Sequence, residues 1–333
     1  MQQNSFRFIC LLFLLSFLAG GMYVQQKVAD EAVLHLEYTT VFTELKQPAA
    51  KINYDESKVP VYTLPDVLTL RNGKKVTTER EWMKKRRPEL LHLFETQVYG
   101  KAPARPKDLH FRLLTEDKNA LNGLATRKEV AVYFTKDEKH FMTVLIYLPN
   151  QRKGQVPIFF GINFKGNHAI HPDEGITFPS KERMIAYGRK RMFPRGSAAS
   201  RWPVEMLMEH GYGLATFYRG DIDPDFDDAF QNGVHPLSYK KGQVRPAEDE
   251  WGTLAAWAWG MSRAMDYIET DKDIDAKRVA IFGHSRLGKT ALWAGAIDSR
   301  FALVISNNSG CGGAALSRRK FGETVRAVNC QFT

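Results

Sequence analysis

The chain has 333 residues, of which 44% are hydrophobic, 25% charged and 12% aromatic. These proportions are typical of a globular protein with a sizeable core, and they argue against extensive disorder. The formal net charge is +10, but the basic residues are scattered, in short clusters such as those at 84–87 and 318–320. Nucleic-acid binding needs basic side chains gathered on one face, so the charge favours an acidic substrate or an anionic polymer.

Residues 1–21 have the pattern of a secretory signal peptide. Arg7 precedes the apolar run 8–19 (FICLLFLLSFLA), and two glycines follow the run. The run is short for a membrane-spanning helix. We therefore expect a secreted or periplasmic protein with no stable membrane partner; an uncleaved N-terminal membrane anchor is the alternative. After it, we expect an N-terminal arm at 22–60 and one α/β domain at 61–333.

The elements of this domain follow in chain order. Residues 77–97 predict a helix that Pro88 interrupts. The apolar and alternating runs then predict strands at 129–134, 143–148 and 156–164. Next come a helix at 203–210, a strand at 213–218, a helix at 251–268, a strand at 278–282, a helix at 288–296 and a strand at 301–306. This alternation predicts a three-layer α/β sandwich with a mostly parallel central sheet, and residues 221–246 predict a long ordered loop over its C-terminal edge.

The segment Gly283-His284-Ser285-Arg286-Leu287-Gly288 lies between a predicted strand and a predicted helix. A tight strand-to-helix turn exposes a serine hydroxyl and leaves helix N–H groups available to an oxyanion. Ser285 is therefore a candidate nucleophile, although Leu287 occupies the place where the G-x-S-x-G pattern has its second glycine. The alternative is that Ser285 only caps the helix.

A second oxyanion donor is expected from the loop at 160–168, where Gly161 and Gly166 permit close backbone approach. His168 either reaches this site or orders the loop. Cys311 and Cys330 are candidates for a disulfide, which the sequence leaves open. No cysteine or histidine spacing resembles a zinc or haem site.

The run GHSRLGKTALWAGAIDSRFALVISNNSGCGGAALSRRKFGET, with NFKGNH and EDEWGTLAAWAWGMSRAMDYIE, resembles carbohydrate esterase family 15, the glucuronoyl esterases (4-O-methyl-glucuronoyl methylesterases) of bacterial type. The resemblance covers about residues 75–324 and implies an α/β-hydrolase fold. It also implies hydrolysis of esters between (4-O-methyl-)glucuronic acid on xylan and the alcohols of lignin, without a metal or other cofactor. The implied partner is a glucuronic-acid-containing polysaccharide.

Carried over residue by residue, the resemblance implies that Ser285 is the nucleophile. It also implies that Arg286 stabilises the oxyanion through its backbone N–H and its guanidinium. Lys289 would bind the sugar's hydroxyl or methoxy groups. The alternatives are a structural ion pair for Arg286 and a solvated helix position for Lys289. Asn308 stands where fungal members have the triad glutamate, and no histidine follows His284.

The absent histidine predicts a C-terminally truncated member with an incomplete sheet and little activity of its own. An upstream histidine as the base (His168, His171, His210 or His235) is a lesser alternative. Two other functions stay open: an acetyl-xylan or sugar esterase, and a non-catalytic carbohydrate-binding chain that uses exposed aromatics such as Trp202 or Trp251. The sequence predicts no oligomeric state.

Overall fold

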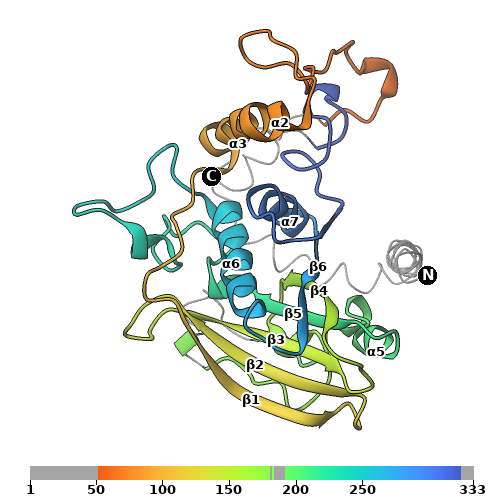
Figure 1. Cartoon of the computed structure of the whole chain (residues 1–333). Coiled ribbons are helices and arrows are strands. Elements are labelled where there is room, and N and C mark those ends of the chain that lie inside the picture. Colours follow the sequence, from red (N-terminus) through yellow and green to blue (C-terminus); the bar gives the residue numbers. More distant parts are fainter. Residues whose placement is uncertain (1–51, 181, 184–191, 324–333) are drawn as a thin grey trace. The chain divides into compact units, whose positions relative to one another are not determined.

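The computed structural model describes residues 52–180, 182–183 and 192–323 (Figure 1). The predicted signal peptide, most of the predicted arm and Cys330 lie outside these ranges. Cys311 is buried and unpaired within the described part of the chain. Each helix in these ranges is too short or too polar to cross a membrane.

The described N-terminal part contains a long helical stretch, Glu79–Tyr99, which confirms the helix predicted at 77–97. A short 3-10 helix (Glu56–Lys58) comes first, and the stretch itself consists of α2 (Glu79–Glu81), a π-helical turn (Trp82–Arg86), α3 (Arg87–Phe94) and a second π-helical turn (Glu95–Tyr99). Pro88 lies in the first turn of α3, and the helical path continues through it after the wider π turn. The predicted interruption is therefore a local widening of the helix rather than its end.

Seven strands form one sheet in the order β1-β2-β3-β5-β4-β6-β7. They are β1 (His110–Ala120), β2 (Ala125–Tyr133), β3 (Phe141–Pro149), β4 (Val156–Asn163), β5 (Gly213–Tyr218), β6 (Ile274–His284) and β7 (Leu303–Asn307). The pairing makes five of the seven run in one direction, whereas β1 and β3 run against them. The predicted mostly parallel sheet is confirmed, and β1 is a strand that the sequence did not predict.

The helices lie on both faces of this sheet. The connection from β4 to β5 contains α5 (Val204–Glu209), and the connection from β5 back to β6 contains α6 (Thr253–Ile268). The two connections cross the sheet in opposite directions, so right-handed crossovers place α5 on one face and α6 on the other. The helix α7 (Arg286–Ile297) packs beside α6 (Figure 1). The three-layer α/β arrangement is therefore confirmed.

Close packing between α7 and the sheet fixes the helix that follows Ser285. Trp257 of α6 is fully buried, as are Phe160 of β4 and Ile281 of β6. A Cβ on Gly295 of α7 would lie 2.2 Å from Val304 Cγ2, so the helix approaches β7 as closely as a glycine allows. Burial of each large side chain contributes about 1.5–3 kcal/mol to stability, and here that burial holds the start of α7 at the end of β6.

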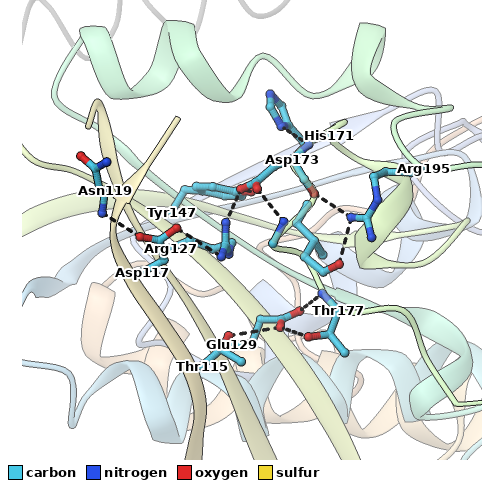
Figure 2. Close-up of polar contacts among 12 residues, drawn as sticks. Thr115, Asp117, Asn119, Arg127, Glu129, Tyr147, His171, Asp173, Thr177 and Arg195 are labelled. Carbon is cyan, nitrogen blue, oxygen red and sulfur yellow. Dashed lines mark hydrogen bonds and ion pairs between the residues drawn. The ribbon is translucent and has the colours of Figure 1, made fainter. Parts of the chain in front are cut away.

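A polar network fastens the loop after β4 to the antiparallel strands (Figure 2). Asp173 accepts hydrogen bonds of 2.6 Å from Arg127 Nη1 and from the Tyr147 hydroxyl. Glu129 accepts bonds from the Thr177 N–H at 3.1 Å and from the Thr177 hydroxyl at 2.5 Å. Because an unsatisfied buried charge is costly, these bonds fix the loop in one position relative to β2 and β3.

Candidate active site

Ser285 is the single residue that joins the end of β6 to the start of α7. Its backbone has φ 56° and ψ −127°, a region that residues with a side chain rarely occupy. Its N–H donates to Asn307 O at 3.0 Å, and its carbonyl accepts from the Gly288 N–H at 2.8 Å. The Ser285 side chain makes no hydrogen bond that caps α7. The capping alternative is therefore wrong, and the geometry is that of a nucleophile elbow.

Two glycines make this elbow sterically feasible. A Cβ on Gly283 would lie 2.0 Å from Leu287 O, and a Cβ on Gly288 would lie 2.9 Å from Asn307 O. At its first turn, α7 thus approaches the end of β7 too closely at Gly288 for a side chain to fit there. This close approach explains why the second glycine of the motif comes one position later than in G-x-S-x-G.

Arg286 occupies the first position of α7, directly after the nucleophile. Its Nη1 atom lies 2.5 Å from Asp225 Oδ1, so the ion pair that the sequence left as an alternative is present. Burial lowers the pKa of Arg286, and the charge of Glu323 offsets only part of this effect. Since arginine has an ordinary pKa above 12, the guanidinium stays positive at neutral pH beside the nucleophile.

Lys289 follows one turn later on the same helix and is 7% exposed. Its backbone N–H donates to Ser285 O at 3.1 Å. Within the described residues, no carboxylate lies within ion-pair distance of its ammonium group. The solvated-helix alternative is therefore wrong. A buried cation is costly without a counter-charge, so this position favours a ligand that supplies acceptors.

Gly161, in β4, and Gly166, in the loop after it, both allow close approach of their neighbours, whereas the second oxyanion donor expected from this segment stays a prediction. The Gly166 N–H donates to Asn163 Oδ1 at 2.7 Å, so this amide is already engaged and is not the second oxyanion donor. A Cβ on Gly161 would lie 2.7 Å from the ring of Phe282, so Gly161 allows close strand packing. The ring of His168 lies against Gly166 and stacks on Phe178 at 4.4 Å. His168 therefore orders the loop.

No histidine in the described ranges is hydrogen-bonded to Ser285. Three of the four upstream candidates have other hydrogen-bond partners, namely the Phe193 carbonyl for His168, Glu205 for His171 and the Met206 carbonyl for His210. The fourth, His235, has its Nδ1 atom 3.2 Å from Asp223 Oδ1. Asn308, exposed and with φ 45°, follows β7 directly. Its amide has no basic oxygen to act as the triad acid.

The two aromatic residues considered as sugar platforms are not equivalent. Trp251 is 3% exposed and packs on His235 at 4.8 Å, so it is a core residue and not an exposed platform. Trp202 is half-buried and lies 5.5 Å from the ring of Phe282. The non-catalytic binding alternative therefore loses one of its two proposed contacts.

Asp225 is the ion-pair partner of Arg286, and sequence reasoning missed it. It lies in the irregular loop after β5, 61 positions before its partner Arg286. The available signal was the alternating acidic run DIDPDFDD, residues 221–228, which follows directly on a buried strand. Carboxylates at the C-terminal edge of a parallel sheet are candidates for the site of an α/β protein.

Comparisons with known proteins agree with this geometry. A family model described as "Glucuronyl esterase, fungi" matches residues 242–331, further than the end at 324 inferred from the sequence. A carbohydrate esterase from an unknown prokaryotic organism is 53% identical over 287 residues, or 84% of this chain and 66% of that protein. The 4-O-methyl-glucuronoyl methylesterase of Schizophyllum commune is 26% identical, over 81% of this chain and 54% of that protein.

Solved structures give the same result. The glucuronoyl esterase from Solibacter usitatus has a TM-score of 0.78 and 47% identity, covering 83% of this chain and 71% of that chain. A CE15 esterase from a marine bacterial metagenome has a TM-score of 0.73 and 51% identity, covering 84% and 72%. The chain thus spans about half to three quarters of these relatives. It belongs to the glucuronoyl esterase family, carbohydrate esterase family 15, and has its α/β-hydrolase fold.

Proposed function

We propose that this chain carries the nucleophile and the oxyanion-binding residues of a serine-type hydrolase of (4-O-methyl-)glucuronic acid esters. The observation that carries the proposal is the strained Ser285 elbow, with Arg286 and the buried Lys289 on the first turn of the helix that follows. The proposed partner is a glucuronic-acid-containing polysaccharide, to which a basic chain is attracted.

In the proposed reaction, Ser285 Oγ attacks the carbonyl carbon of the uronate ester. The tetrahedral oxyanion forms beside the N–H groups at the start of α7 and the guanidinium of Arg286. The C–O bond to the alcohol then breaks, the alcohol leaves with a proton, and the uronoyl group remains on Ser285. Water releases it as the free uronic acid. Lys289 holds the hydroxyl or methoxy oxygens of the sugar.

We further propose that these 333 residues turn over slowly by themselves, since no described histidine is hydrogen-bonded to Ser285. In serine hydrolases, the oxyanion site and substrate binding alone leave about 10³–10⁴-fold acceleration over water when a triad member is removed. This residual rate does not depend on the serine, so Ser285-dependent turnover of these residues is expected only when a base is added to the assay.

The test is chemical rescue. Benzyl glucuronate hydrolysis is followed with increasing imidazole for the native chain and for Ser285→Ala, and the rate of free imidazole is subtracted. We expect a rate that rises with imidazole in the native chain and not in Ser285→Ala. The Solibacter esterase serves as the positive control. Equal rates for the two chains at every imidazole concentration would refute the proposal.

The same assay with an acetylated xylan separates the acetyl-esterase alternative. We expect cleavage of the uronate ester to exceed cleavage of the acetyl ester. The acyl group of a uronate ester is a sugar whose hydroxyl or methoxy oxygens Lys289 can bind, whereas an acetyl group has no such oxygens. A preference for acetyl esters would favour the alternative.

We also propose that the protein is exported by the signal sequence at residues 1–21. The short apolar run after Arg7 supports cleavage rather than anchoring. Expression in a bacterial host and mass spectrometry of the periplasmic fraction test this. A mature N-terminus near residue 22 is expected, whereas an intact N-terminus in the membrane fraction would favour the anchor.

A further inference from the structure

The two ends of the loop that follows β5 lie against each other, at residues 222–223 and 233–235, and we call these residues the neck. The Val234 N–H donates to Ile222 O at 2.8 Å, and His235 Nδ1 lies 3.2 Å from Asp223 Oδ1. Both side chains of this second pair are at most 2% exposed. A Cβ on Gly233 would lie 2.3 Å from Asp223 Oδ1, so only a glycine fits there. The segment 224–232 therefore starts and ends at fixed points.

The neck is also attached to the helix layer. Trp257 Nε1 donates to the Asp223 carbonyl at 3.0 Å, and Trp257 is fully buried in α6. His235 packs between Phe230 at 4.7 Å and Trp251 at 4.8 Å. The loop is therefore positioned by the same core that holds α7, and a residue next to the neck has little freedom to move.

Asp225 lies two residues beyond Asp223 and joins two arginines. Its Oδ1 pairs with Arg286 Nη1 at 2.5 Å, and its Oδ2 pairs with Arg219 Nη1. The Arg219 guanidinium lies 5.4 Å from the ring of Phe164 and 5.5 Å from the ring of Trp257. These cation–π contacts favour one orientation of Arg219, and Arg219 in turn fixes Asp225.

The exposed fraction of the side chain decreases from Arg286 to Asp225 to Arg219. Its side chain is 32% exposed, against 14% for Asp225 and 11% for Arg219. Arg286 is thus the member that faces a ligand, and the other two lie behind it. The Asp225 carboxylate is therefore shared between two guanidiniums, of which that of Arg286 is the more exposed.

We propose that Asp225 is a positioning residue, which holds the Arg286 guanidinium in place for the oxyanion while Arg219 neutralises the Asp225 carboxylate from behind. The inference rests on the proposed function. A free arginine side chain has many rotamers, and a preformed ion pair removes most of the entropy loss of ordering it from the reaction step. The contribution therefore falls on the transition state rather than on substrate binding.

The experiment compares Ser285-dependent hydrolysis of benzyl glucuronate, with imidazole present, in the native chain, Asp225→Asn and Arg286→Ala. Arg286→Ala is expected to lose about 10²–10³-fold in kcat, and Asp225→Asn about tenfold with KM changed much less. In the Arg286→Ala background, Asp225→Asn should cause no further loss. Asp227→Asn, an exposed neighbour in the same loop, is the matched control and should keep the native rate.

A second variant and a spectroscopic measurement keep the proposal testable if the Asp225→Asn protein does not fold. Arg219→Gln removes the compensating charge without touching Arg286 and should also lower kcat. The Nε–H resonance of Arg286, assigned by its loss in Arg286→Lys, should shift in Asp225→Asn and not in Asp227→Asn.

The outcomes separate the two proposals. If Asp225→Asn behaves as Asp227→Asn does, or if its loss adds fully to that of Arg286→Ala, the positioning role is overturned and the esterase proposal stands. If no chain shows Ser285-dependent hydrolysis, the proposed function fails and the role of Asp225 in it fails too, whatever the resonance does.

Discussion

Substitution of Gly283 by alanine tests whether the elbow geometry is as tight as the structure indicates. The added Cβ would lie 2.0 Å from Leu287 O and 2.3 Å from the carbonyl carbon of the same residue. Carbon atoms in ordinary contact are about 3.5–4.0 Å apart, so backbone must move by about 1 Å or more. Neither atom belongs to a flexible side chain, so the displacement falls on the turn that carries Ser285.

Such overpacking typically costs about 1–3 kcal/mol, and we expect Gly283→Ala to lie at the upper end, near 3 kcal/mol. A displacement of about 1 Å at a reacting group can lower the rate about 100-fold. The free energy of unfolding is measured by urea denaturation followed by circular dichroism. The Ser285-dependent rate is measured on benzyl glucuronate with imidazole.

Gly252→Ala is the matched control. Gly252 has φ −92°, and its nearest neighbour for a Cβ is Tyr99 O at 3.9 Å, so alanine fits without strain. We expect a change within about 1 kcal/mol, which includes the gain from a less flexible unfolded chain. Equal stabilities and equal rates for Gly283→Ala and Gly252→Ala would refute the steric argument for the elbow.

Three further predictions concern the charged groups. Lys289→Met should raise KM for benzyl glucuronate more than it lowers kcat, as Michaelis curves would reveal. Lys128→Met should lower the free energy of unfolding in urea by about 3–5 kcal/mol, because it leaves Asp271, 4% exposed, without its cation. Burial alone would raise the pKa of Asp173, but hydrogen bonds, foremost that from Tyr147, lower it below its ordinary value. Its stabilising effect is therefore present above the ordinary pKa of about 3.9 and is lost as the pH falls through the lowered pKa, so the urea midpoints of the native chain and Asp173→Asn should converge below about pH 4.

Much of the fold follows from local sequence pattern. The strand at 213–218 was predicted at its observed bounds, and 156–164 and 301–306 fall within one or two residues of β4 and β7. These strands are buried runs between turn residues, where pattern and burial agree. The strand β1 was missed because it is a sheet edge, mostly exposed, and its sequence HFRLLTEDKNA has no apolar alternation.

The sequence predicts candidate site residues only where they are neighbours along the chain. Ser285, Arg286 and Lys289 all lie within the segment 285–289, so a single motif predicts all three. Asp225 depends on a contact between segments 61 residues apart, which no local pattern encodes. The hydrogen bond of the Gly166 amide is local, since its acceptor Asn163 lies three residues away, but its acceptor is a side-chain oxygen whose orientation the sequence pattern does not give.

The most direct test of the central claim is to identify the residue that becomes acylated. The native chain is incubated with benzyl glucuronate and imidazole, quenched in acid, digested and analysed by mass spectrometry. We predict a single glucuronoyl group on the peptide that contains Ser285, and none on that peptide from Ser285→Ala. A glucuronoyl group on another residue, or hydrolysis that continues unchanged in Ser285→Ala, would contradict the assignment of Ser285 as the nucleophile.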